Sequence, residues 1–142
     1  MITDLDILTE FYKLINVADV ITTIDGKIYK AEKPIDRTSK DIVVGCLYNR
    51  PSNNNHLFTG VVNINCFCQE LDNHTPDNIN LNIVSYAVLK ALNIVNGFGN
   101  SGLLSYTLDS IKTFRDQDDL GMYYTNIRLD YTYKTLIVTG KQ

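Results

Sequence analysis

Runs of basic residues, long apolar stretches and cysteines are all scarce in this sequence. Lys and Arg are scattered and the formal net charge is -3. Both facts argue against sequence-independent binding of nucleic acid, which needs a basic face. No apolar stretch approaches the ~18 residues of a membrane-spanning helix, so we expect no membrane partner. The three cysteines, an odd number, do not indicate a disulfide framework. Residues 1–6 lack the regions of a signal peptide, which favours a protein kept in a reducing cytoplasm.

Sequence motifs for catalysis and cofactor binding are also missing. The glycine-rich segment 97–102 follows a predicted helix, whereas phosphate-binding loops follow a strand and open a helix. Cys66 and Cys68 have strand spacing, and Cys46 is expected too far along a neighbouring strand to share a metal with them. Both histidines lie in polar loops without the surroundings of a Cys–His nucleophile. We therefore predict no enzyme activity, no bound metal and no cofactor.

The residues that are present predict one folded domain over residues 1–142. The chain is 44% hydrophobic and 20% charged, an ordinary globular balance, and is long enough to bury a core. Hydrophobic spacing predicts helices over 4–15 and about 77–96, with a short helical turn within 17–24. Strands are predicted over 27–30, 41–48, 57–70, 103–114 and 121–134.

This order of elements predicts the fold class. Helices and strands do not alternate strictly, so we expect an α+β fold with a mostly antiparallel sheet. Strands 41–48 and 57–70 should form a long β-hairpin, and two helices should pack on one face of the sheet. A hairpin with a polar tip and a free edge could serve as a docking arm.

Two polar loops are the candidate contact regions. The tip of the expected hairpin is rich in Asn, and the turn 115–119 concentrates carboxylates without the glycine and distal glutamate of an EF-hand loop. Such loops can set the register between subunits. The candidate inter-subunit or ring-docking residues are Arg50, Ser52, Asn53, Asn54, Asn55, His56, Arg115, Asp116, Asp118 and Asp119.

The whole chain resembles the tail-completion or tail-terminator (head–tail joining) proteins of tailed bacteriophages. The likeness lies in the order of its elements. These are the short strand 26–29 leading to Pro34, the strand 41–45, the long strand 60–68, the Pro-Asp-Asn-Ile segment 76–79 that opens the second helix, and the last strand 123–131. The Asn-rich segment 52–55 departs from the family pattern.

The resemblance implies a structural protein of the virion. Such proteins form a ring, commonly a hexamer, at the joint between head and tail. Their partners are copies of themselves and other neck and tail proteins, with DNA only as a passing strand in the channel. Assembly would take place in the host cytoplasm, and the family supplies no catalytic residues. The alternative is a small non-enzymatic adaptor or binding domain that acts through its sheet edge.

Overall fold

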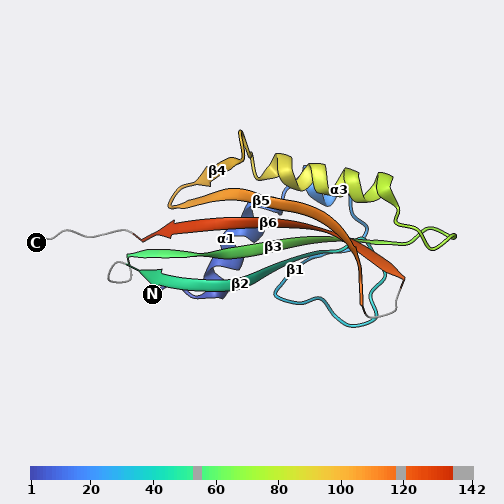
Figure 1. The fold of residues 1–142 in the computed structure, drawn as a ribbon, viewed down its shortest axis with the longest axis horizontal. Coiled ribbons are helices and arrows are strands. Elements are labelled where there is room, and N and C mark those ends of the chain that lie inside the picture. The colour runs from blue at the N-terminus through green and yellow to red at the C-terminus, as the bar shows by residue number, and fades with distance from the viewer. Residues whose placement is uncertain (53–55, 118–120, 136–142) are drawn as a thin grey trace, which may run out of the picture.

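The computed structural model describes residues 1–52, 56–117 and 121–135, which form one curled sheet and three helices (Figure 1). The helices are α1 (Asp4–Ile15), α2 (Ala18–Ile21) and α3 (Asn78–Ala91). The strands are β1 (Ile28–Lys30), β2 (Ile42–Ser52), β3 (Leu57–Gln69), β4 (Phe98–Ser101), β5 (Leu104–Arg115) and β6 (Met122–Lys134). In the sheet the strands lie in the order β1-β2-β3-β6-β5-β4.

The two longest strands, β3 and β6, form the centre of this sheet. They pair antiparallel over their full length, from Leu57↔Lys134 to Gln69↔Met122. All other pairs are antiparallel too, except that β1 runs parallel to β2. Register shifts interrupt β2 between Cys46 and Tyr48 and interrupt β5 between Leu108 and Ser110. Such bulges increase the local twist, in keeping with a curled sheet.

The predicted fold class was wrong. The sheet is mixed because β1 joins β2 in parallel, and the described residues form six strands and three mostly short helices in place of a simple two-helix layer on a hairpin sheet. β2 and β3 do pair antiparallel, but β6 covers the other edge of β3 along its whole length. The two strands are therefore an integral part of the sheet, and β3 has no free edge for docking.

Local signals explain where the helices begin and end. The Thr3 hydroxyl accepts a hydrogen bond from the Asp6 N–H while the Asp6 carboxylate accepts one from the Thr3 N–H, a capping box that starts α1. The Asp77 carboxylate accepts from the Asn80 N–H at the start of α3. α3 ends before the predicted residue 96, because Asn93 adopts a positive φ of 52°.

The hydrophobic core lies between the helices and one face of the sheet. α1 contributes four buried side chains, Ile7, Leu8, Phe11 and Ile15. Alternate residues of β3 and β6 meet them and the buried residues of α3. Figure 1 shows α1 behind the sheet, so the opposite face, toward the viewer, is left largely uncovered by helices. The residues of β3 and β6 on this open face include several Asn and an Arg.

Candidate interaction surfaces

The tip of the β2–β3 hairpin lies at one end of the sheet. Among the predicted contact residues here, Arg50, Ser52 and His56 are described, whereas Asn53, Asn54 and Asn55 lie outside the described residues. The guanidinium of Arg50 lies over the Tyr48 ring, 5.0 Å from its centroid. The His56 carbonyl accepts a hydrogen bond of 3.0 Å from the Thr135 N–H. The base of the tip is therefore joined to the end of β6.

The turn between β5 and β6 lies at the opposite end of the sheet. At this end, Arg115 of β5 pairs with Tyr123 near the start of β6. At the other end, Ser52 of β2 pairs with Leu57 of β3, and Leu57 pairs with Lys134 at the end of β6. The two predicted loops are thus separated by the length of the strands and cannot form one surface. Asp116 is described, whereas Asp118 and Asp119 lie outside the described residues.

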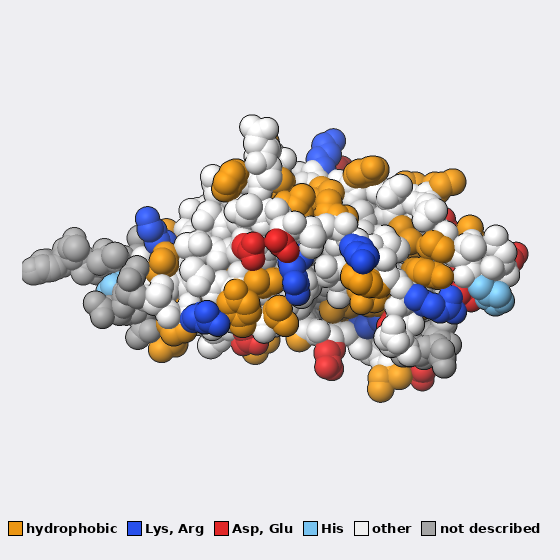
Figure 2. Space-filling view, viewed as in Figure 1, with side chains coloured by type: hydrophobic (Ala, Val, Ile, Leu, Met, Phe, Trp, Pro, Cys, Tyr) orange, Lys and Arg blue, Asp and Glu red, His pale blue; other side chains and the backbone are white. Residues whose placement is uncertain are grey.

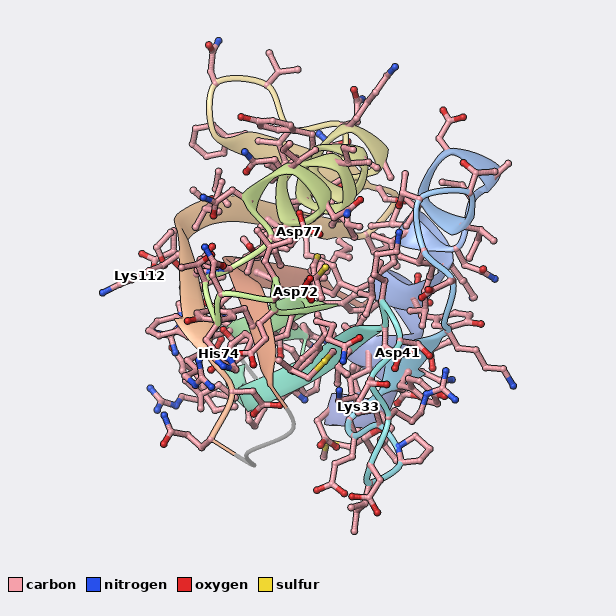
Figure 3. All side chains as sticks on the ribbon, turned by 90° about the vertical axis from the view of Figure 1, so that its right-hand side faces the viewer. Lys33, Asp41, Asp72, His74, Asp77 and Lys112 are labelled. Carbon is pink, nitrogen blue, oxygen red and sulfur yellow. The ribbon has the colours of Figure 1, made fainter. Side chains whose placement is uncertain are left out.

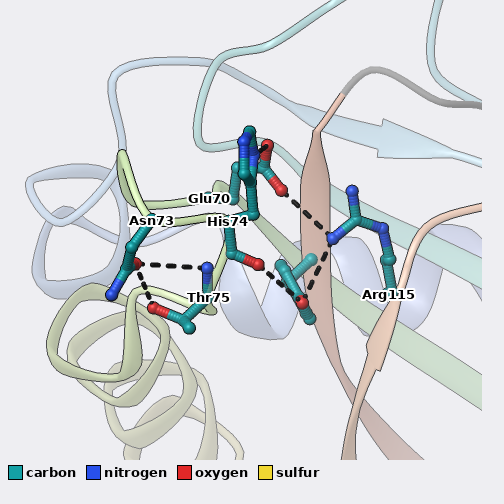
Figure 4. A network of polar contacts seen from close by, with 6 residues as sticks. Glu70, Asn73, His74, Thr75 and Arg115 are labelled. Carbon is teal, nitrogen blue, oxygen red and sulfur yellow. Dashed lines mark hydrogen bonds and ion pairs between the residues drawn. The ribbon is translucent and has the colours of Figure 1, made fainter.

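A polar network connects this second end to the loop before α3 (Figure 4). Arg115 Nη1 lies 3.1 Å from Glu70 Oε2 and donates a 3.2 Å hydrogen bond to the Tyr123 hydroxyl. His74 Nδ1 lies 2.8 Å from Glu70 Oε1, and the Tyr123 hydroxyl donates to the His74 carbonyl. The hydrogen bond with His74 and the charge of Arg115 lower the pKa of the Glu70 carboxyl. Arg115 therefore joins two segments of its own chain.

The outer edge of β5 is only partly paired. β4 covers its first residues, from Ser101↔Leu104 to Phe98↔Thr107. Within the described part of the chain no strand lies beyond residues 109–115, and all seven of these residues are exposed. A strand edge of this kind presents backbone N–H and C=O groups to which another chain can pair.

Apolar side chains are also exposed on α3 and β4. Ile79 is 75% exposed, Tyr86 is 68% exposed and Phe98 is 65% exposed, and Ile83 completes the helical spacing of this row. Figure 2 shows hydrophobic side chains along the upper rim of the molecule, where α3 and β4 lie. Several large apolar side chains exposed along one rim make it a candidate for contact with another protein.

The three cysteines do not converge. Cys66 is fully buried and Cys68 is 4% exposed, so both belong to the core. Cys46 pairs opposite Val62, four residues from Cys66 along β3, so it is displaced along the neighbouring strand as predicted. Among the described residues, no group of three or more His, Cys, Asp or Glu side chains could hold a metal ion. In the same residues, no helix has the length and hydrophobicity of a membrane span.

We expect thiol labelling to distinguish these cysteines. Burial raises the pKa of all three thiols, that of Cys66 to about 12, and only Cys46 is partly exposed. Because the thiolate is the reactive form, an alkylating reagent at about pH 8 should modify Cys46 slowly and leave Cys66 and Cys68 intact. Mass spectrometry of the labelled, folded protein measures the order in which the three cysteines are modified. The C46S variant should lose native labelling, and rapid modification of Cys66 before unfolding would contradict the prediction.

Comparison with known proteins identifies a shared fold. No family model matches the chain, and no curated protein matches it. Among solved structures, the chain is similar to one from the "Virion of native gene transfer agent (GTA) particle". The TM-score is 0.55 at 14% sequence identity, and the match covers 87% of this chain and 91% of that chain. The likeness therefore extends over nearly the whole of both chains, and at this identity it shows the fold.

Proposed function

We propose that this chain is a structural protein of a phage-like virion. The observation that carries the proposal is the shared fold with a chain of a gene transfer agent virion, over 87% of one chain and 91% of the other. Because the match leaves little of either chain unaccounted for, the two proteins share one architecture. The chain's role is then to assemble, and we propose no catalytic function for it.

Within the virion, we propose that the chain forms a ring at the head–tail joint, around the DNA channel. The order of helices and strands that resembles tail-terminator proteins supports this position. Two further features fit a ring subunit. The β2–β3 tip and the β5–β6 turn lie at opposite ends of the sheet, so each could contact a different neighbouring protein. The partly unpaired edge of β5 and the exposed apolar row on α3 could contact the next copy.

Particle composition tests this function. Purified particles should contain the chain, and gold-labelled antibody should mark the junction of head and tail in electron micrographs. Deleting the gene should leave heads and tails that do not join, and plasmid-borne wild-type chain should restore joining. Absence of the chain from purified particles would refute the virion role. Label along the tail or over the head would retain that role and refute the position at the joint.

The open edge of β5 also supports a second candidate, a non-enzymatic adaptor that binds a partner through strand addition. In that case the partner strand would pair with residues 109–115. Light scattering with size-exclusion chromatography at rising concentration separates the candidates in part. A ring-sized oligomer favours the virion ring. A monomer that is also missing from purified particles favours the adaptor.

A further inference from the structure

The open face of the sheet carries a hollow formed by the three neighbouring strands β3, β6 and β5. Its volume is about 390 Å³. The side chains that determine its chemistry are Asn63, Asn65, Lys112, Phe114, Asn126 and Arg128. None of these residues belongs to the two loops discussed above, and the hollow lies on the face opposite the core.

The amide groups in this hollow have a defined orientation. The Asn126 Nδ2 group donates to Asn63 Oδ1 at 3.1 Å and to Asn65 Oδ1 at 2.7 Å. Arg128 Nε donates to the same Asn63 oxygen at 3.3 Å. The oxygens of Asn63 and Asn65 are therefore engaged, and their NH₂ groups are left as hydrogen-bond donors. The one amide acceptor without such a bond among these three residues is Asn126 Oδ1.

Two cations add to these donors. Neither Lys112 nor Arg128 forms an ion pair within the described residues. Asp130 follows Arg128 by two residues on the same face, about 7 Å along the strand. Figure 3 shows Lys112 pointing outward from β5, on the side opposite α1. Asp109 also adjoins the hollow, and its carboxylate accepts a 3.5 Å hydrogen bond from the lining residue Ser110. The lining itself contains two cations and no carboxylate, and it is rich in hydrogen-bond donors, which fits an anionic ligand.

An aromatic row borders the hollow and helps to decide between a protein and a nucleic acid. Phe114 stacks on Tyr124 at 5.6 Å between centroids, and Tyr124 packs on Phe67 at 5.1 Å. Lys33 lies over the Phe67 ring at 3.9 Å, and Phe67 is only 8% exposed. The rings thus stack on one another, whereas binding of single strands needs ring faces open to the bases. Phe114, 40% exposed, still offers an apolar contact to a polypeptide.

We propose that this hollow is a docking site for an acidic segment of another protein. Carboxylate side chains of that segment would accept hydrogen bonds from Lys112, Arg128 and the amides of Asn63 and Asn65. Its apolar atoms would pack on Phe114. The charge complementarity is the basis of the proposal, and it holds whether or not the chain forms a ring.

The test uses the full chain and an N-acetylated hexaglutamate peptide at low ionic strength, where such contacts are least screened. In ¹H–¹⁵N spectra the peptide should shift the amide signals of the hollow. The double variant K112Q/R128Q should bind about tenfold or more weakly, because it loses two charge-assisted donors. K112Q alone should also weaken binding. Its lysine makes no hydrogen bond among the described residues, so this variant tests the site if the double variant does not fold. The matched control is K13Q/K90Q, which removes two exposed charges on α1 and α3.

Three results would overturn the proposal. The first is the absence of peptide-induced shifts at the hollow. The second is an equal loss of affinity in the control variant, which would indicate attraction to overall charge. The third is tighter binding of hexathymidylate than of hexaglutamate, measured by the shifts of the same amide signals. That result would assign the hollow to nucleic acid.

Discussion

Replacing Asp41 by Asn should destabilise the protein by about 3 kcal/mol or more. Asp41 is fully buried immediately before β2, and its carboxylate accepts three hydrogen bonds. Arg37 donates two of them, from Nε at 3.0 Å and from Nη2 at 3.1 Å, and the Lys27 N–H donates the third at 2.8 Å. The amide NH₂ of Asn would face one of these donors, and the charge that pairs with Arg37 would be lost. The side-chain bonds that hold Arg37 and the backbone of Lys27 against residue 41 would then be weakened.

Urea unfolding followed by tyrosine fluorescence and circular dichroism measures this effect. The matched control is D36N, in the same loop, where Asp36 is exposed and has a positive φ of 66° that Asn also tolerates. D36N should change the free energy of unfolding by less than about 0.5 kcal/mol. Equal effects of the two variants would mean that the carboxylate of Asp41 does not stabilise the fold.

Elements defined by local sequence were predicted well. The helix predicted over 4–15 is α1, and the strands predicted over 57–70 and 121–134 are β3 and β6 within one residue at each end. These segments combine clear hydrophobic periodicity with a local start or stop signal, such as the Thr3 cap. Little information from distant parts of the chain is needed to form them.

Elements that depend on distant partners were missed or misplaced. No strand was predicted at β4, because Phe98–Ser101 has no strand pattern and is extended through its pairing with β5. β2 continues through Pro51 to Ser52, since β3 pairs with it there. β1 pairs only with residues 42–44 of β2, so among the described residues the other side of Pro51 has no strand that needs its missing N–H. The parallel pairing of β1 with β2, which makes the sheet mixed, leaves no local signal at all.

The surfaces show the same division between local and distant information. The polar loops could be found from composition, but their separation to opposite ends of the sheet required the register of the strands. Asn63 and Asn65 alternate with apolar residues in the sequence, a pattern typical of a half-buried strand. Their contacts with Asn126 and Arg128, on a strand some sixty residues later, follow only from the pairing of β3 with β6.

Replacing Phe11 by Ala should destabilise the protein by about 3–5 kcal/mol, a large part of the stability of an ordinary domain. Phe11 is fully buried on α1. Its ring lies 5.4 Å from that of Tyr106 on β5 and 6.2 Å from that of Tyr131 on β6, between centroids. Removing it leaves a cavity between helix and sheet and abolishes both aromatic contacts. F11L should cost less, because most of the volume is kept.

The two tyrosines make it difficult for the cavity to close. The Tyr106 hydroxyl donates to the Leu92 carbonyl after α3 at 2.6 Å, and the Tyr131 hydroxyl donates to Asn49 Oδ1 on β2 at 2.6 Å. Moving either ring into the space would break a hydrogen bond, so we expect F11A near the upper end of its range. The control is L5A on the same helix, where Leu5 is 59% exposed. Urea unfolding of both variants compares them. If F11A and L5A were equally stable, α1 would not be held to the sheet through Phe11.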